Sequence, residues 1–552
     1  MRSFHMSISR SLVPVLILFS SPMSSHAAGE IEFIITSDYL NIPVSHSDER
    51  VRMIMTCEGT DTMPVEVRLA TSEPDYWVFR DISALKGKTM YINCAPENAG
   101  LYAIYQADTI NGQSSIYSEL QRPQYHFTTK RGWLNDPNGI VYLDGEYHLF
   151  YQHDPYDRDG VHKHWGHAVS SDLLHWQELP QAISPDNNGD IWSGTAVIDY
   201  ANTSGFATGS NPVMIAAYTV DNGRTETQHI AFSNDRGRTF TKYTGNPVIA
   251  SNEKWATIHT RDPKLLRYRD SHWVMVLCER DGHSIYTSDN LRDWTYRSHI
   301  TGFWECPELF ELPVDGNPEN TLWVMYGASG TYMLGNFDGA SFTPLSGKHK
   351  YTGGSIYAAQ TFNNIPTSDG RRIQIGWGRI NIPDAPFNQL MLLPTELTLA
   401  NTKDGVRLLN RPVREIDSLC YPIDARTNIT QQEAEDILNE YAHIDGLRIK
   451  LKIGLSHATD ASLWYGGQRL IDYDLNGTTF NGHFYSPQNP VSMDINADIF
   501  IDRGVAEVFI DNGLFSDSMG LNPFIENAKF NLRGNNLEIY SLEILKVNSI
   551  WK

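Results

Sequence analysis

The chain has few cysteines, fewer basic than acidic residues and, after its N-terminal segment, no long apolar run. Five cysteines in 552 residues are too few for the disulfide framework of a small secreted scaffold. The formal net charge of −21 argues against nucleic-acid binding, because phosphate groups require a basic surface. A bilayer-spanning helix needs about 20 apolar residues, so no membrane span is expected.

The cysteines are scattered along the chain. Cys57 and Cys94 share the N-terminal part, and the sequence leaves open whether they pair. Cys278, Cys306 and Cys420 are expected to be single buried thiols, which is the usual state of scattered cysteines.

Residues 1–28 have the features of an export signal. They combine positive charge with an apolar core over residues 12–19, and Ser25 and Ala27 are small residues at the two positions that a signal peptidase reads. The core is too short to span a bilayer. We therefore expect a mature chain that starts near Ala28 or Gly29 and is exported to the periplasm, the cell surface or the medium.

Short runs of alternating apolar and polar residues dominate the rest of the chain. Residues 146–151 and 272–277 are typical, and Gly, Asn, Asp and Pro separate such runs. This pattern predicts short antiparallel strands. The clearest helix candidate, residues 431–441, is brief, so we predict an all-β fold.

A polar turn followed by an aromatic residue recurs in the middle of the chain. Its copies contain Asp172, Asp235, Asp289 and, in degraded form, Asp338, at a spacing of about fifty to sixty residues. Such a period suits four-stranded blades. Residues 127–400 have room for about five of them, which predicts a five-bladed β-propeller. The hairpins of a large sandwich would not readily explain the even spacing.

The chain after the signal divides into three predicted domains. Residues 29–120 lack the repeat and are predicted to form a small N-terminal β-sandwich-like module. Residues 121–412 carry the repeat and form the predicted propeller. Residues 413–552 include alternating strands followed by the turn Asp511-Asn512-Gly513, which predicts a C-terminal β-sandwich.

Three carboxylates stand in short, distinctive motifs. Asp136 lies in Trp-Leu-Asn-Asp-Pro-Asn-Gly, Asp262 in Arg-Asp-Pro and Glu305 in Trp-Glu-Cys-Pro. Cleavage of a glycosidic bond requires one carboxylic acid that protonates the leaving oxygen and one carboxylate that attacks or stabilises the anomeric centre. Because proline restricts the residue before it, each acid is predicted to lie at a strand end in stiff, extended backbone. Taken singly, Asp-Pro is also an ordinary turn starter.

The predicted propeller would bring these acids together. Asp136 lies at the opening of the first blade, Asp262 near that of the third and Glu305 at that of the fourth. Innermost strands of successive blades run parallel around a central channel. Residues at equivalent places on different blades therefore converge on one funnel.

From about residue 124 onward the chain resembles the glycoside hydrolases of family 32. That family includes invertases, inulinases and levanases and is built as a five-bladed propeller followed by a β-sandwich. The first 120 residues resemble the extra β module of some bacterial members. The matching stretches, in the family's order, are residues 133–139, 150–152, 165–168, 192–194, 261–263, 305–307 and 500–513.

The resemblance implies hydrolysis of levan, inulin, fructo-oligosaccharides or sucrose with retention of configuration. Asp136 would form a covalent fructosyl ester, and Glu305 would act first as acid and then as base. Asp262 would bind fructose hydroxyls and stabilise the transition state. Retention would place the two main carboxyls about 5–5.5 Å apart. The residues expected to bind substrate or tune the acids are Asn135, Gln152, Trp192, Ser193 and Arg261.

The chain departs from the family pattern near the predicted pocket. Many members carry a Trp shortly after the Gln-x-x-Pro stretch, whereas residues 156–162 contain none. The usual Phe-Ser of the second blade is Trp192-Ser193 here. The preferred linkage, and the choice between exo and endo cleavage, therefore stay open.

Other polar residues are assigned structural roles. His162, His164 and His167 lack the spacing of a zinc site, and the neighbouring acids lack the downstream Glu of a calcium loop. Neither a metal nor a cofactor is therefore expected. Asp199 and Glu226 are assigned to turn or surface positions.

Three other functions are compatible with parts of the pattern. A non-catalytic fructan-binding protein on the same scaffold would have no need for three intact acids. A fructosyltransferase would share the covalent intermediate and differ only in the acceptor. An inverting arabinan-type glycosidase would fit the motif of Asp136 less well. We expect a carbohydrate, small or polymeric, as the partner and a monomeric chain.

Overall fold

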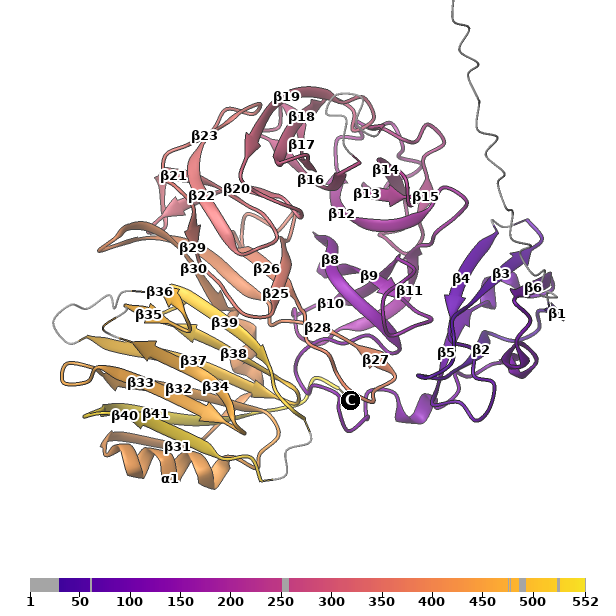
Figure 1. The fold of residues 1–552 in the computed structure, drawn as a ribbon. Coiled ribbons are helices and arrows are strands. Elements are labelled where there is room, and N and C mark those ends of the chain that lie inside the picture. Colours follow the sequence, from indigo (N-terminus) through magenta and orange to yellow (C-terminus); the bar gives the residue numbers. More distant parts are fainter. Residues whose placement is uncertain are drawn as a thin grey trace, which may run out of the picture.

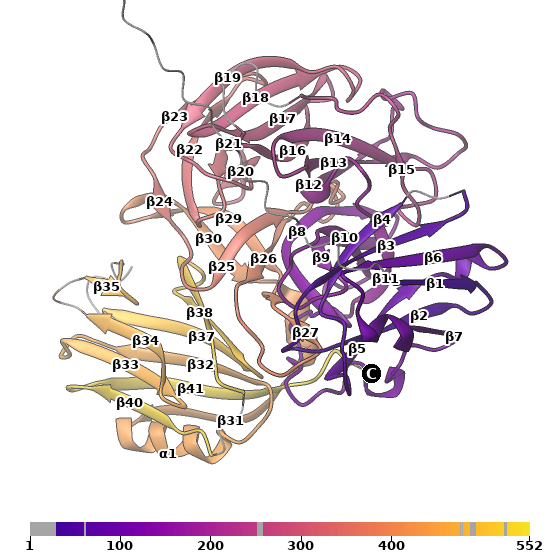
Figure 2. The ribbon, with the colours of Figure 1, turned by 45° about the vertical axis from the view of Figure 1, so that its right-hand side comes forward.

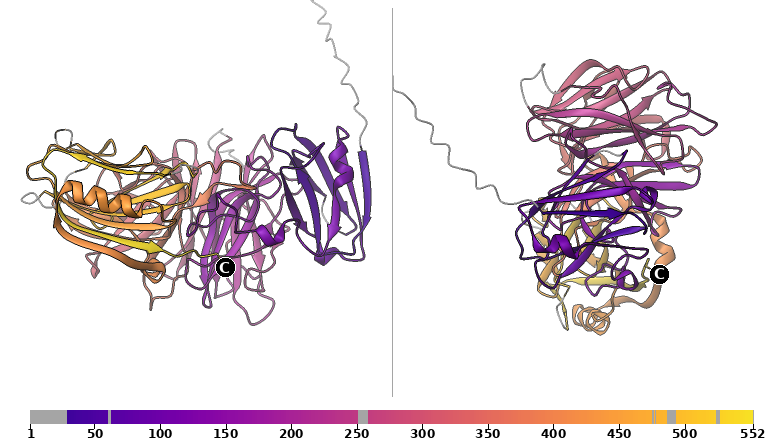
Figure 3. Two further views of the ribbon diagram at one scale, coloured as in Figure 1. Left: turned by 90° about the horizontal axis from the view of Figure 1, so that it is seen from below. Right: turned by 90° about the vertical axis from the view of Figure 1, so that its right-hand side faces the viewer.

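The computed structural model describes residues 29–59, 62–250, 258–474, 476, 478–485, 493–523 and 527–551. The predicted export signal, residues 1–28, lies outside this part of the chain. Strands dominate, which confirms the all-β prediction. Figure 1 shows a central ring of sheets with one group of strands on either side, and the edge-on view in Figure 3 places the three groups in a row. Within the described residues, no helix is long and apolar enough to cross a membrane.

The N-terminal strands form two small sheets beside the ring. Alternate residues of one strand, including Met53, are buried, as expected for a strand with one face on a core. Cys57 lies opposite Met90 and Cys94 opposite Met53, and both cysteines are thiols. In order, the sheets contain β1 (Gly29–Ile34), β6 (Thr89–Ala95), β3 (Val51–Cys57) and β4 (Met63–Val67), and then β5 (Tyr76–Asp81), β2 (Tyr39–Val44) and β7 (Tyr105–Ala107).

The ring is the predicted propeller. Each blade is an antiparallel sheet whose first strand lies innermost, and a short parallel pair between Phe387 of β27 (Phe387–Asn388) and Gly132 of β8 joins the fifth blade to the first. The first three blades are β8 (Gly132–Leu143), β9 (Glu146–Asp154), β10 (His164–Ser170) and β11 (Gln177–Ile183); β12 (Asp190–Asp199), β13 (Val213–Asp221), β14 (Glu226–Ser233) and β15 (Thr241–Lys242); and β16 (Thr260–Tyr268), β17 (His272–Glu279), β18 (Gly282–Ser288) and β19 (Thr295–Thr301). The last two are β20 (Glu308–Val314), β21 (Asn317–Tyr326), β22 (Thr331–Phe337) and β23 (Phe342–Pro344); and β25 (Ile356–Thr361), β26 (Arg372–Gly378), β29 (Thr395–Thr402) and β30 (Gly405–Pro412).

The recurring polar turn joins the third and fourth strands of a blade. In the first blade the Asp172 carboxylate accepts hydrogen bonds from the backbone N–H groups of Leu174 and His175, which closes the turn. Asp235 and Asp338 lie at the equivalent places of the second and fourth blades. In the third blade the equivalent acceptor is Asn290 rather than Asp289, so the predicted alignment of that copy is wrong by one residue.

The C-terminal strands pack as two sheets around one apolar core. The helix predicted over residues 431–441 is present as α1 (Gln431–Tyr441), because Thr430 and Glu433 form a capping box at its start. The predicted turn at Asp511-Asn512-Gly513 joins two paired strands. The sheets are β31 (Cys420–Ile429), β41 (Glu538–Val547), β32 (Leu447–Gly454), β37 (Asp494–Asp502), β38 (Val505–Ile510) and β39 (Phe515–Gly520), and β36 (His483–Phe484), β35 (Thr479–Phe480), β34 (Gln468–Asp474), β33 (Asp460–Tyr465) and β40 (Phe530–Gly534).

A buried ionic group joins the propeller to the C-terminal sheets. The His126 ring, just before β8, lies 2.9 Å from an Asp502 oxygen and 3.0 Å from a Glu507 oxygen. Glu507 also accepts a hydrogen bond from the backbone N–H of Leu393. Burial alone would lower the pKa of His126, but the hydrogen bonds to the two carboxylates outweigh it and raise this pKa to about 9.

This group predicts a pH-dependent stability. Because the pKa of His126 is raised on folding, its contribution is fully present below pH 6.5 and is lost as the pH rises through about 9. The substitution His126→Gln leaves two buried carboxylates without their cation and should cost about 3–5 kcal/mol at pH 6. Thermal unfolding followed by circular dichroism should show that His126→Gln loses much stability at pH 6 and less at pH 10.

The exposed His46 provides a matched control for this experiment, because His46→Gln should leave the thermal midpoint unchanged at both pH values. An equal loss of stability at pH 6 and pH 10 in His126→Gln would contradict a charged imidazole at this junction.

Candidate active site

The three predicted carboxylates lie around one mouth of the propeller channel. Asp136 is near the start of β8, Asp262 is near the start of β16, and Glu305 stands just before β20. The Cys306 sulfur lies 3.6 Å from Asp136 Oδ2 and 3.6 Å from Asp262 Oδ2. The structure therefore brings residues from the first, third and fourth blades into one pocket.

Asp136 is held by polar side chains of the first two blades. Ser193 Oγ donates to Asp136 Oδ2 (2.5 Å), and Asn135 Nδ2 donates to Oδ1 (3.1 Å). Gln152 joins these two residues, since its Nε2 donates to Ser193 Oγ (2.5 Å) and its Oε1 accepts from Asn135 Nδ2 (3.0 Å). Three residues predicted to line the pocket thus form one network with the carboxylate.

Glu305 is oriented by a cation and a phenol. Arg261 Nη1 donates to Glu305 Oε1 (3.2 Å), and Tyr357 Oη donates to Oε2 (2.6 Å). The Glu305 side chain keeps 23% of its surface exposed, so it faces the pocket entrance. The sequence analysis did not identify Tyr357. Its place near the start of β25, the innermost strand of the fifth blade, is the signal that could have identified it.

Arg261 is itself shared between two carboxylates. Its Nη2 lies 3.0 Å from Glu226 Oε1, and its Nε donates to Glu226 Oε2 (3.1 Å). Glu226 is buried, so its assignment to a turn or surface position is wrong. No motif marks this residue in the sequence, because its contact with Arg261 exists only once the second and third blades are adjacent.

The backbone at two of the acids differs from the prediction. Asp262 (φ 59°), Glu305 (φ 51°) and Cys306 (φ 41°) all adopt left-handed rather than extended conformations. At Asp262 the cause is a β-bulge, since the register between β16 and β17 shifts between Arg261 and Lys264. Each left-handed residue costs about 1–3 kcal/mol and persists only where its surroundings hold it.

Hydrogen bonds hold this strained backbone in place. The Asp262 N–H donates to Thr219 Oγ1 (3.0 Å), and the Cys306 N–H donates to Asp262 Oδ2 (3.0 Å). The second bond fixes the two segments against each other across the mouth. The bulge and the left-handed residues thereby re-aim the acid side chains toward the pocket.

The crowding of acids shifts their protonation. Burial, followed by the charges of Asp136 and Glu305, raises the pKa of Asp262 to about 8. Burial also raises the pKa of Asp136, although hydrogen bonds from Ser193 and Asn135 oppose this effect. The pocket therefore retains a proton at neutral pH. Burial and the nearby carboxylates raise the pKa of the Cys306 thiol well above its usual range, which excludes a thiolate nucleophile.

Aromatic side chains surround the mouth. The Arg261 guanidinium carbon lies 5.3 Å from the ring centroid of Trp192 and 5.6 Å from that of Trp304. The Trp133 and Trp377 rings are 6.1 Å apart. Trp192 and Trp304 thus lie beside Arg261 and Trp377 lies beside Trp133, and aromatic rings are a surface of the kind that binding pockets use.

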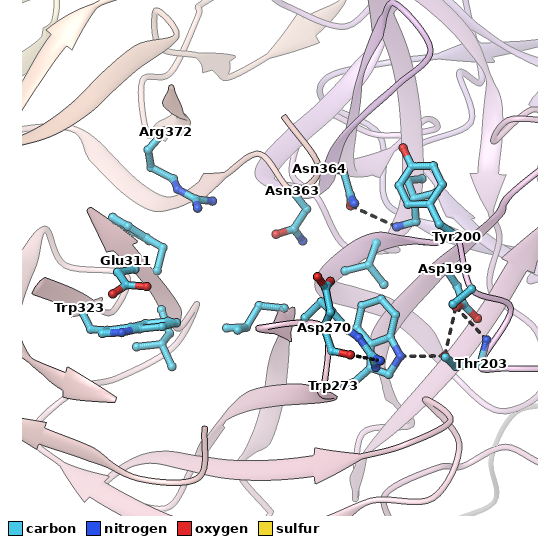
Figure 4. A pocket seen from close by; sticks show the side chains of 17 residues that line it. Asp199, Tyr200, Thr203, Asp270, Trp273, Glu311, Trp323, Asn363, Asn364 and Arg372 are labelled. Atoms are coloured by element: carbon cyan, nitrogen blue, oxygen red, sulfur yellow. Dashed lines mark hydrogen bonds between the residues drawn. The ribbon is translucent and has the colours of Figure 1, made fainter. Parts of the chain in front are cut away.

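A second cavity, of about 380 Å³, lies at the opposite ends of the inner strands. Its lining, shown in Figure 4, contains none of the predicted active-site residues. The Asp199 carboxylate accepts hydrogen bonds from the backbone N–H groups of Thr203 and Ser204, and Trp273 Nε1 donates to Thr203 Oγ1. Asp199 therefore stabilises a turn, as predicted, and the candidate active site is at the other mouth.

The histidines after β9 have separate environments. His162 Nδ1 lies 3.0 Å from an Asp190 oxygen, whereas His167 contacts the His148 ring. Among the described residues, no group of three or more His, Cys, Asp or Glu side chains is arranged to hold a metal ion.

Comparisons with known proteins agree with this geometry. Residues 126–412 match the model of the glycosyl hydrolases family 32 N-terminal domain. The chain is 37% identical over 490 residues to a levanase of Bacillus subtilis, covering 79% of this chain and 72% of that protein. It is 31% identical over 523 residues to an extracellular exo-inulinase of Aspergillus ficuum, covering 79% and 96%.

The fold has solved counterparts. The crystal structure of exo-inulinase from Aspergillus awamori superposes with a TM-score of 0.68 at 26% identity, covering 79% of this chain and all of that one. The predicted propeller and C-terminal sandwich are thereby confirmed. The family match spans the carboxylate pocket itself. On these grounds the chain belongs to glycosyl hydrolase family 32.

Proposed function

We propose that this protein releases fructose from β-fructofuranosides such as levan, inulin, fructo-oligosaccharides and sucrose by double displacement with retention of configuration. One observation carries the proposal: Asp136, Asp262 and Glu305 come from different blades yet share one pocket, where Cys306 contacts both aspartates. The substrate class is supported by the relatives, which are named levanase and exo-inulinase.

In the first step Asp136 attacks the anomeric carbon of the fructosyl unit. The bond to the leaving oxygen breaks as Glu305 protonates that oxygen, and a fructosyl ester of Asp136 forms. Hydrogen bonds from Ser193 and Asn135 hold the attacking carboxylate in one orientation. Arg261 and Tyr357 do the same for Glu305.

In the second step water cleaves the ester. Glu305 now takes a proton from the water, whose oxygen attacks the anomeric carbon, and Asp136 leaves as a carboxylate. Asp262 hydrogen-bonds fructose hydroxyls in both steps. Because its pKa is about 8, it carries a proton at neutral pH and can donate as well as accept. Two inversions give overall retention.

The proposal extends to the organisation of the chain. Residues 1–28 direct export, residues 29–120 form the N-terminal module, residues 121–412 the catalytic propeller and residues 413–552 the C-terminal sandwich. The chain acts as a monomer. A relative named as an extracellular exo-inulinase supports the exported location.

Loss of the nucleophile should abolish hydrolysis. Asp136→Asn keeps the size of the side chain and one of its two accepting oxygens but cannot form the ester, so fructose release from sucrose and levan should fall by at least about 10⁴-fold. Reducing-sugar assays measure the loss, and circular dichroism checks the fold. Asp144→Asn, at an exposed turn aspartate, is the matched control and should keep full activity. Full activity in Asp136→Asn would refute the nucleophile assignment.

The effect of removing the Glu305 acid should depend on the leaving group of the substrate. Glu305→Gln should lower turnover of sucrose by about 10²–10⁴-fold. A fructoside with a good leaving group needs little protonation, so its first step should be far less affected. Added azide, which needs no general base, should then yield β-fructosyl azide. Equal losses on both substrates, with no azide product, would count against Glu305 as acid and base.

Product analysis separates hydrolysis from the other functions. With wild-type protein and sucrose, inulin or levan, chromatography over time should show fructose as the main product, and added methanol should give methyl β-fructofuranoside because configuration is retained. Growth of fructo-oligosaccharides at high sucrose would indicate a transferase. Binding without products would indicate a non-catalytic protein, and an α-configured product would indicate inversion.

A further inference from the structure

The segment between β9 and β10 forms part of the wall beside the pocket. Both oxygens of the buried Asp154 carboxylate accept backbone N–H groups of this segment, Oδ1 from Tyr156 (3.0 Å) and Oδ2 from Val161 (2.9 Å) and His162 (3.0 Å). The segment is therefore closed on itself around one side chain. It occupies the place where residues 156–162 depart from the family pattern.

The N-terminal module holds this segment from outside. Arg50 reaches Asp157 (2.8 Å) and Asp159 (2.6 Å), and Arg68 reaches the same two residues at 2.7 and 2.6 Å. Asp157 is only 1% exposed, so its charge depends on these two arginines. Figure 2 shows the strands of the module beside those of the first blade.

The inner end of the segment reaches the nucleophile through Lys163. Lys163 Nζ donates to Asn135 Oδ1 (2.9 Å), which also accepts from Trp133 Nε1 (2.8 Å). Both lone pairs of this oxygen are thus occupied, so the carboxamide cannot flip. Its NH₂ group is held toward Asp136 and Gln152.

Space is tight where the segment meets these side chains. Gly160 has a φ of +63°, and a Cβ there would lie 2.5 Å from both Lys163 Nζ and Trp133 Nε1. Any displacement of the segment would therefore also shift Lys163 Nζ and Trp133 Nε1, the two groups that donate to Asn135 Oδ1. The ion pairs of Arg50 and Arg68 with the outside of the segment form an outer clamp. This outer clamp is thereby coupled to the orientation of the Asn135 side-chain amide at the active site.

We propose that the N-terminal module is a working part of the active site: Arg50 and Arg68 fix residues 154–163, and through them Lys163 acts as a positioning residue for Asn135 and Asp136. The inference rests on the proposed role of Asp136 as nucleophile. It gives the module a function in catalysis rather than in substrate capture or attachment. The positive charge of Lys163 also favours the ionised form of Asp136, which is the form that attacks.

The test uses the full-length protein and steady-state kinetics on sucrose across pH. Lys163→Met should lower kcat/KM by about 10- to 100-fold, since small displacements of a reacting group are costly. The acid limb of its profile of kcat/KM against pH should move to higher pH, because Asp136 without the cation is protonated more readily. Lys163→Arg, which keeps the charge, should keep the wild-type acid limb.

The outer clamp is tested by the double variant Arg50→Gln/Arg68→Gln. It should lower kcat/KM by about tenfold and move the acid limb in the same direction as Lys163→Met. Arg52→Gln, on an exposed face of the same module, is the matched control and should leave both unchanged. If the double variant fails to fold, Asp159→Asn weakens the same clamp with a single neutral substitution.

The outcomes distinguish the two proposals. Wild-type kinetics and pH profile in Lys163→Met would overturn the inference while leaving the nucleophile assignment intact. Unchanged kinetics in a folded clamp variant would show that the module only packs against the propeller. Absence of fructose release by the wild-type protein, or full activity in Asp136→Asn, would instead overturn the proposed function.

Discussion

Three carboxylic acids share one buried pocket only while protons, cations and hydrogen-bond donors offset their mutual repulsion. Arg261 divides its charge between Glu305 and Glu226, and Ser193 donates to Asp136. One proton stays in the pocket because the pKa of Asp262 is raised to about 8. That proton lies on the residue proposed to bind fructose hydroxyls, whereas the proposed chemistry requires Glu305 to donate a proton while Asp136 attacks as an anion.

The propeller supplies the geometry that makes such crowding possible. Its inner strands start around one mouth, and each blade contributes a short stretch there. Left-handed backbone at Asp262 and Glu305 turns the acids inward at a cost in conformational energy. Hydrogen bonds across the mouth, including that from the Cys306 N–H to Asp262 Oδ2, offset that cost.

The first blade is also where the flanking domains converge. The C-terminal sheets hold His126, just before β8, through two buried carboxylates. The N-terminal module holds the segment after β9 through two arginines. Each junction contains a buried carboxylate, Asp502 in the first and Asp157 in the second, and a buried charge depends on its partners. The strand that carries Asp136 is thus fixed from both sides.

The sequence alone determined the all-β fold, the five-blade period, the helix at residues 431–441 and the three acids, because turns, alternation and short motifs are local properties. It failed where a contact joins distant segments. Glu226 and Tyr357 carry no motif, and the clamp of Arg50 and Arg68 on Asp157 pairs residues far apart in the chain. The backbone at Asp262 also departed from the local rule for residues before proline, because a bulge against β17 overrode it. Only tertiary structure decided these features, since the free energy of a buried charge or a strained residue depends on neighbours that the folded chain supplies.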